Sequence, residues 1–222
     1  LKCFEIGSTF GKDLIDDEAL PKEQDALCIG LYGEGYDFFT LKGIVTEMLN
    51  VLKIKDPEFE AENGYRVYHP GRCARISYKG EELGIMGEIH PDVAELMGIG
   101  KRCYVAEFMF DKVIKNASTE VYYSPLPKYP AVARDIALLI KEDIPAGSVE
   151  KVICEAGGNI LESVKLFDVY RGKQVDSGMK SAAFALTYRH PEKTLTDEEV
   201  AKIHEKVLAA LKEKFDAVLR DV

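Results

Sequence analysis

Basic side chains gather in one stretch of this chain, residues 162–193, where aromatic and small side chains lie between them. The stretch holds six basic residues and four acidic ones. They are Lys165, Arg171, Lys173, Lys180, Arg189 and Lys193, against Glu162, Asp168, Asp176 and Glu192. Cations suit the phosphates of a nucleic acid strand, and the rings of Tyr170 and Tyr188 suit the stacking of its bases. The chemistry that these residue types indicate is the binding of unstacked RNA bases.

Other reactive residue types form no recognisable constellation. The histidines are His69, His90, His190 and His204, and the cysteines are Cys3, Cys28, Cys73, Cys103 and Cys154. Neither set has the spacing of a zinc site or a disulfide framework, which needs tighter clustering. The glycines of residues 30–35 and 98–101 lack the strand and helix context of a phosphate-binding loop. We therefore predict no catalytic residue and no metal ligand, and we interpret the cysteines as reduced core thiols.

The balance of charge limits the classes of partner. The chain is 46% hydrophobic and 30% charged, which is typical of a globular protein. Residues 1–123 contain 14 basic and 22 acidic residues, and residues 124–222 contain 15 and 16. These numbers argue against attraction of the whole chain to a polyanion, but a local basic face in the second half is compatible with them. No apolar run reaches the ~18 residues of a membrane span. Because Leu1 stands in what reads as a strand in progress, we expect a piece of a longer protein, and the scattered, reduced cysteines indicate a cytoplasmic one.

A proline-rich segment divides the chain. Three prolines follow one another closely, Pro125, Pro127 and Pro130. Proline holds the backbone extended and cannot continue a strand ladder. We therefore predict a linker over residues 119–129, between a domain of residues 1–118 and a domain of residues 130–222.

The first domain reads as mixed helices and strands. Residues 37–53 place apolar side chains on one stripe, which indicates an amphipathic helix. Residues 73–89 read as a hairpin with a Lys-Gly turn, residues 90–99 as a short helix and residues 103–110 as a further strand. Hairpins mixed with helices indicate an antiparallel α+β domain.

The second domain has a clearer order. Residues 134–141 read as a strand, residues 147–158 as a helix ended by two glycines, and the basic stretch as two strands. Thr196 and Glu199 form a capping box that opens a last helix, and residues 216–222 read as a short strand. This βαββαβ order predicts a ferredoxin-like fold, in which two helices cover one face of a four-stranded antiparallel sheet. The other face stays open, and RNA, a small ligand or another protein would each fit such a face.

Side-chain alternation limits which residues of the basic stretch face outwards. The larger side chains of residues 182–188 share one face, most simply the buried one. A flat open face is then formed by Ser181, Ala183, Ala185 and Thr187. On the preceding strand one set is Leu166, Asp168 and Tyr170, and the other is Phe167, Val169 and Arg171. Alternation alone allows either set to be open, but a buried unpaired carboxylate is costly, which favours the set that contains Asp168.

Four segments of the chain stand out in combination. They are YRVYHPGRCARISYKGEELGIMGEIHPDV, PLPKYPAVARDIALLI, LFDVYRGK and HPEKTLTDEEVAKIHEKVLAALKEKF. Within them RDIA, LFDVYRGK and TLTDEEV are each weak alone and specific together. In this order, and over essentially the whole chain, the segments resemble the C-terminal part of the bacterial phenylalanyl-tRNA synthetase β subunit.

The resemblance implies a division of labour. Residues 1–118 would belong to a catalytic-like domain with a class II synthetase fold, and residues 130–222 would form a ferredoxin-fold anticodon-binding domain. In this family the α subunit of an α2β2 enzyme performs the chemistry, which attaches phenylalanine to tRNA(Phe) with ATP and Mg2+. An active class II core holds the ATP α-phosphate with an arginine on its motif 2 strand. The strand that resembles motif 2 here is Phe4-Glu5-Ile6-Gly7, and a carboxylate in that place repels a phosphate. We therefore expect the chain to hold neither cofactor and to be inactive alone.

The resemblance also directs the choice of RNA-binding residues. The expected contacts with the anticodon loop are Arg134, Asp135, Asp168, Tyr170, Arg171, Lys173, Ser181, Tyr188 and Arg189. Tyr170 would stack on a base, and Asp168 would accept hydrogen bonds from base amino groups. The two arginines of the hairpin and Lys173 would meet phosphates, and Tyr188 would reach the rim of the sheet with its hydroxyl.

Two alternatives remain open from the sequence. Arg134 and Asp135 either join the RNA site or pair with each other. The piece as a whole either binds RNA or serves as a protein-interaction scaffold with little RNA affinity of its own. The helix of residues 37–53 is a candidate surface for the α subunit, although its apolar stripe would equally serve the core of its own domain.

Overall fold

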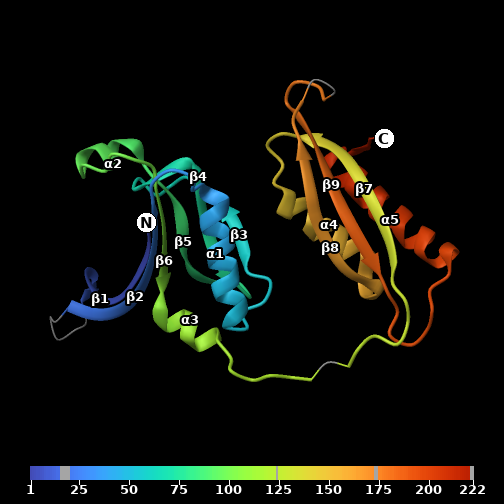
Figure 1. The fold of residues 1–222 in the computed structure, drawn as a ribbon, viewed down its shortest axis with the longest axis horizontal. Helices are drawn as coiled ribbons and strands as arrows, with labels where there is room; N and C mark the ends of the chain where they lie inside the picture. Colours follow the sequence, from blue (N-terminus) through green and yellow to red (C-terminus); the bar gives the residue numbers. More distant parts are fainter. Residues whose placement is uncertain (16–20, 124, 173–174, 221–222) are drawn as a thin grey trace. The chain divides into compact units, whose positions relative to one another are not determined.

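Two antiparallel sheets, one in each half of the chain, organise the structure (Figure 1). The structure is a computed structural model that describes residues 1–15, 21–123, 125–172 and 175–220. The chain divides into two units, residues 1–122 and residues 123–222. This division falls inside the predicted linker, after the last helix of the first unit, which ends at Asn116, and before the first strand of the second, which begins at Val132.

The first unit is built on a six-stranded sheet in the order β1-β2-β6-β5-β4-β3. Its strands are β1 (Lys2–Ile15), β2 (Pro21–Tyr32), β3 (Glu58–Ala61), β4 (Tyr68–Tyr78), β5 (Glu81–Ile89) and β6 (Cys103–Met109). Its helices are α1 (Phe38–Val51), α2 (Pro91–Leu96) and α3 (Phe110–Asn116). Every neighbouring pair of strands runs antiparallel, which is the α+β arrangement that the sequence predicts.

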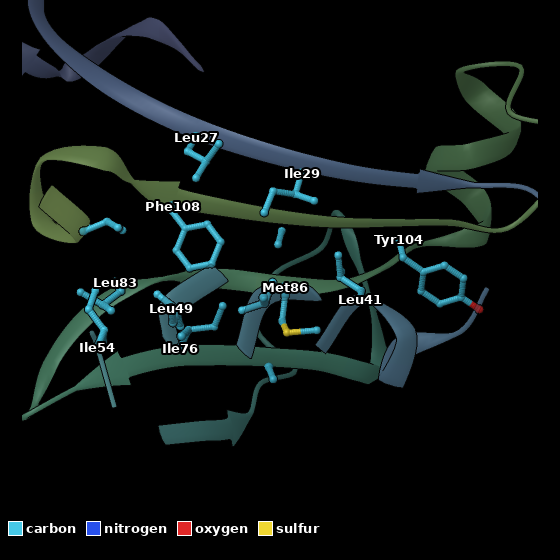
Figure 2. Close-up of a cluster of buried hydrophobic side chains, with 14 of the residues drawn as sticks. Leu27, Ile29, Leu41, Leu49, Ile54, Ile76, Leu83, Met86, Tyr104 and Phe108 are labelled. Carbon is cyan, nitrogen blue, oxygen red and sulfur yellow. The ribbon is translucent and has the colours of Figure 1, made fainter. Parts of the chain in front are cut away.

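The core of the first unit lies between the sheet and the helices α1 and α3. Leu41, Val45 and Leu49 form the inner stripe of α1 and are fully buried. Figure 2 shows sheet side chains of the same cluster, among them Leu27, Ile29, Met86, Tyr104 and Phe108. The helix begins where the Asp37 carboxylate accepts a hydrogen bond from the Thr40 amide at 2.7 Å. The predicted stripe of this helix therefore serves the core of its own unit.

The second unit is built on a four-stranded sheet in the order β10-β7-β9-β8. Its strands are β7 (Val132–Lys141), β8 (Leu161–Tyr170), β9 (Met179–Tyr188) and β10 (Val218–Leu219). Its helices are α4 (Ala146–Gly157), the 3-10 turn η1 (Gly158–Ile160) and α5 (Asp197–Phe215). The order βαββαβ confirms the predicted ferredoxin-like topology, and Figure 1 shows α4 and α5 behind one face of the sheet.

The ends of the two helices follow the signals in the sequence. The Thr196 hydroxyl accepts from the Glu199 amide at 3.3 Å, and the Glu199 carboxylate accepts from the Thr196 amide at 3.0 Å. This is the predicted capping box. Gly158 ends α4 with a φ of 60°, where a side chain would be strained. Local hydrogen bonds therefore fix the start of α5, and one glycine fixes the end of α4.

Some features of the structure differ from the expectations. The strands β2 and β3 and the helix α3 are not among the predicted elements, and β2 ends within the glycine-containing stretch of residues 30–35. The five cysteines form no disulfide among the described residues, but Cys3 and Cys154 are exposed and only Cys73 is buried. The interpretation of all five as core thiols is therefore wrong.

In the described part of the chain, no helix combines the length and the apolar character that crossing a membrane requires.

Candidate nucleic-acid interface

Strand register defines the face of the second sheet that α4 and α5 leave uncovered. Residues paired across neighbouring strands share a face. One row pairs Ile136 with Phe184 and Phe184 with Leu166, and all three lie in the core. The alternate rows face away from the helices. We name these residues the open face: Ala133, Asp135, Ala137, Leu139, Ser163, Lys165, Asp168, Tyr170, Ser181, Ala183, Ala185 and Thr187.

Strand β9 presents its side chains as alternation predicts. The buried residues are Ala182, Phe184, Leu186 and Tyr188, and the small residues between them face outwards. Ser181 belongs to the open face, yet it is only 4% exposed. In register it lies between Leu139 and Tyr170, whose larger side chains flank it. In this conformation Ser181 therefore does not offer its hydroxyl to a ligand, contrary to the expectation.

Two β-bulges interrupt the pairing of β8 with β9. The extra residues are Glu162 and Phe167, each of which has no partner of its own on β9. The Phe167 side chain is 54% exposed and is not part of the core cluster. It is a large aromatic ring beside the open face that alternation did not assign to it, because a bulge leaves no mark on the apolar pattern.

The bulge at Phe167 decides the orientation of the residues around it. Asp168 pairs with an outward residue of β9, as does Tyr170, so both lie on the open face. Leu166 pairs with Phe184 and packs against the core. The predicted outward placement of Asp168 and Tyr170 is therefore confirmed, but the prediction that Leu166 shares their face is wrong.

The ring of Tyr170 has two close neighbours. A Cβ atom added to Gly172 would lie 2.1 Å from Oη of Tyr170, so the ring rests on the Gly172 backbone. The guanidinium carbon of Arg220, just after β10, lies 5.2 Å from the centre of the ring. The side chain of Tyr170 is thus held in place, and the residue keeps 37% of its surface exposed.

Tyr188 does not lie at the rim of the sheet. Its side chain is fully buried, and its hydroxyl is 3.2 Å from Nδ1 of His204 on α5. Burial raises the pKa of Tyr188 to about 12. The expectation that Tyr188 contacts RNA is corrected by this placement, because neither its ring nor its hydroxyl reaches the surface.

Arg134 and Asp135 point to opposite faces of β7. Arg134 forms an ion pair with Asp197 at the start of α5, with an N–O distance of 3.1 Å. Asp135 pairs in register with Ala185 on the open face. The two residues therefore do not pair with each other, and of the two only Asp135 stands on the open face.

Most cations of the basic stretch already have partners. The ion pairs are Arg171 with Glu142 at 2.8 Å, Arg189 with Glu162 at 3.0 Å, and Lys193 with Glu199. Lys180 is buried and donates to the Glu142 carbonyl at 2.8 Å. Lys165, on the open face, makes no ion pair within the described ranges, and Lys173 lies outside them. In the sequence, the only signal for Lys165 is its position between the apolar residues Val164 and Leu166. Lys165 is therefore not among the expected RNA contacts.

The strand that resembles motif 2 lies in β1 of the first unit. Glu5 pairs with Cys28, and Cys28 pairs with Glu107, in a row on the face away from α1 and α3. Tyr68 donates to the Glu107 carboxylate at 2.9 Å. Burial, together with the charge of Glu107, raises the pKa of the Cys28 thiol. The row thus presents two carboxylates and an inert thiol, which is the wrong charge for holding a phosphate.

Comparisons with known protein families match each unit separately. Residues 1–110 match the family described as "Phenylalanyl tRNA synthetase beta chain CLM domain". Residues 127–220 match the family described as "Ferredoxin-fold anticodon binding domain". Together with the two antiparallel sheets, these matches confirm the fold class predicted from the sequence, a class II synthetase-like α+β domain followed by a ferredoxin-like domain.

Relatives of known name cover nearly the whole chain. The phenylalanine–tRNA ligase β subunits of Clostridium tetani and Clostridium acetobutylicum are 42% and 45% identical to it over 219 residues, which is 99% of this chain and 27% of each relative. That of Bacillus subtilis is 39% identical over 98% of this chain and 28% of its own length. The chain thus spans about a quarter of the length of the relatives it matches.

A crystal structure of pyrrolysyl-tRNA synthetase from Desulfitobacterium hafniense is similar over 51% of this chain and 40% of its own, with a TM-score of 0.42 and 19% identity. The chain belongs to the phenylalanyl-tRNA synthetase β-chain family, of which it holds the CLM domain and the ferredoxin-fold anticodon-binding domain.

Proposed function

We propose that this chain binds the anticodon loop of tRNA(Phe) on the open face of its second unit. One observation carries the proposal: the unit that matches an anticodon-binding family turns an aromatic ring and two carboxylates out of a sheet face without helices. These groups belong to Tyr170, Asp135 and Asp168. Ala183 and Ala185 lie between them in register and leave a flat floor on which a base can rest.

Each outward group has a distinct role in the proposed complex. Tyr170 stacks on a base, because every base offers a π-face to an aromatic ring. Asp135 and Asp168 accept hydrogen bonds from base amino groups. Lys165 meets a phosphate directly, since it makes no ion pair with a described residue and stands on the open face. Lys173 belongs to the same proposal, although it lies outside the described residues.

The two arginines of the basic stretch contribute less in this proposal than their charge suggests. Arg171 reaches a phosphate only by leaving Glu142, and Arg189 only by leaving Glu162. Arg189 also donates to the Tyr129 carbonyl. Exchanging a carboxylate for a phosphate gains little, because both partners are anions near the surface. These ion pairs favour a second candidate function, a scaffold with little RNA affinity of its own.

Titration with the cognate anticodon stem-loop, at low and at moderate salt, separates the two candidates. We expect binding that weakens as salt rises, because phosphate contacts release counterions. Tyr170→Ala should cost about 1–3 kcal/mol of binding free energy, roughly a 5- to 150-fold rise in Kd. Tyr123→Ala, which removes an exposed ring from the linker, is the matched control and should leave Kd unchanged. No binding at low salt would favour the scaffold.

For the first unit we infer a structural role in a cytoplasmic α2β2 enzyme. That enzyme attaches phenylalanine to tRNA(Phe) with ATP and Mg2+ on its α subunit, and the first unit packs against that subunit. Exposed apolar side chains on β1 support this inference: Phe4 is 73% exposed and Ile6 is 50% exposed. In register they share the sheet face of the core residues Ile29 and Leu27. A partner that covers β1 would extend the core of the unit.

A further inference from the structure

One side of the Tyr170 ring rests on Gly172. A Cβ atom added to Gly172 would lie 2.1 Å from Oη of Tyr170, 2.3 Å from Cζ and 2.8 Å from Cε1. An atom at the edge of the ring cannot have these distances, because it would then lie closer to a Cε carbon than to Oη. The three distances fit a position above the ring face, at its hydroxyl end. The backbone of Gly172 therefore supports the ring from one side.

Arg220 reaches the same ring from the opposite edge of the sheet. Its amide donates to the Ala137 carbonyl at 2.9 Å, which extends the pairing of β10 with β7 by one residue. Since Leu219 pairs with the core residue Leu138, alternation places Arg220 on the same side of the sheet as the open face. Its guanidinium carbon lies 5.2 Å from the centre of the Tyr170 ring, within the range of a cation–π contact.

The residues between the two edges allow this reach. Ala137 and Ala183 pair with each other on the open face, and their side chains are too short to obstruct a long one. Ser181, in register beside Tyr170, is only 4% exposed although it faces away from the helices. The larger neighbours of Ser181 in register, Leu139 and Tyr170, flank it, and the guanidinium of Arg220 lies over the Tyr170 ring beside it.

We propose that Arg220 closes the stacking site of the free protein, and that a base must displace its guanidinium to stack on Tyr170. This inference rests on the proposed anticodon binding and adds a regulation of the same site. A guanidinium and a base both bind the π-face of a tyrosine ring, and they compete for one position. An exposed cation–π contact favours the closed form over the open one by about two- to fivefold, so about a third to a sixth of the molecules are open and the apparent affinity falls about three- to sixfold.

The test measures stem-loop affinity at about 0.5 M salt, where exposed phosphate contacts are largely screened. Arg220→Ala should bind about three- to sixfold more tightly than the unchanged chain, because the competitor is gone. Lys202→Ala removes one positive charge from α5, on the helix side of the sheet, and should not tighten binding. In a Tyr170→Ala background the gain from Arg220→Ala should disappear.

The outcomes separate this inference from the proposed function. An affinity of Arg220→Ala equal to or below that of the unchanged chain would overturn the competition, as would a gain that persists without Tyr170. If Tyr170→Ala weakens binding while Arg220→Ala does not strengthen it, anticodon binding stands and the closing role of Arg220 falls. If the unchanged chain does not bind the stem-loop even at low salt, both proposals fall together.

Discussion

The hydroxyl of Tyr188 lies 3.2 Å from Nδ1 of His204, a contact that joins β9 to α5 inside the second unit. The rings meet edge to face, with centres 6.3 Å apart. Burial, and then the charge of Arg134, lowers the pKa of His204. A residue that the sequence suggested for RNA binding thus forms part of the packing between sheet and helix, and its partner is a histidine held neutral.

The contact predicts an acid-sensitive second unit. Because the folded chain lowers the pKa of His204, its contribution to stability is fully present above the ordinary value of 6.5 and is lost as the pH falls through the folded pKa. We expect protection of the β9 and α5 amides against hydrogen exchange to fall as the pH drops below 6.5. In His204→Phe, which keeps a ring and cannot titrate, this dependence should flatten. An unchanged pH dependence in the variant would show that another group is responsible.

A second expectation concerns stronger acid and the start of α5. Lys193 and the Thr196 amide lower the pKa of Glu199 to about 2. The stability that Glu199 contributes is therefore present above its ordinary value of 4.5 and is lost as the pH falls from there through about 2. Helical circular dichroism should show the first turns of α5 loosening in this range. Glu199→Gln keeps a hydrogen-bonding side chain and should remove this part of the transition, and a transition of the same size in the variant would contradict the assignment.

Gly172 should matter for RNA binding without touching RNA. Gly172→Ala places a Cβ atom 2.1 Å from Oη of Tyr170, so the ring must move. We expect weaker stem-loop binding, by up to the ~1–3 kcal/mol that a stacked ring contributes. Gly147→Ala is the matched control, because a Cβ there meets nothing within 4 Å and the residue lies in the first turn of α4. Equal binding by the two variants would mean that the position of the ring does not control affinity.

The chain alone should not activate phenylalanine. We expect no phenylalanine-dependent exchange of pyrophosphate with ATP and Mg2+, because the row of Glu5, Cys28 and Glu107 offers carboxylates and no cation to a phosphate. The assay requires protein free of host synthetase, and heat-denatured chain provides the background. Exchange above that background would contradict the expectation.

The exposed apolar side chains of β1, Phe4 and Ile6, predict that the α subunit binds at this edge strand of the first sheet. Phe4→Asp should reduce capture of the cognate α subunit, because it places a charge in the inferred interface. Phe39→Asp, at a similarly exposed ring on α1, tests the other candidate surface. Loss of capture only with Phe39→Asp would move the interface from β1 to the outer side of α1. Full capture by both variants would exclude both surfaces.

The elements that the sequence revealed are those whose local signals agree with their packing. Helix α5 has a capping box at Thr196 and an apolar stripe that the core buries. The strand β2 was missed because its first half is polar, with Glu23, Gln24 and Asp25 preceding the buried Leu27. The helix α3 has only 7 residues, too few for its period to show. Tertiary pairing, and not local preference, makes these elements.

In the candidate site too, the sequence predicts the regular parts and not those that depend on tertiary pairing. On β9 the pairing is regular, so alternation alone identified the outward residues. On β8 the bulges at Glu162 and Phe167 break the period of two, and no residue type announces them. The contact of Arg220 with Tyr170 joins strands at the two edges of the sheet, so it becomes visible only once the strand order is known.

The bulge at Phe167 also makes the length of β8 adjustable. Leu166 pairs with Phe184 and Asp168 pairs with Ala183, which is the next residue along β9. A chain from which Phe167 is deleted would thus keep both pairings and would turn the same side chains outwards. The strand can gain or lose this one residue without reversing its faces. A related chain could therefore have or lack the ring of Phe167 while Asp168 keeps its pairing with β9.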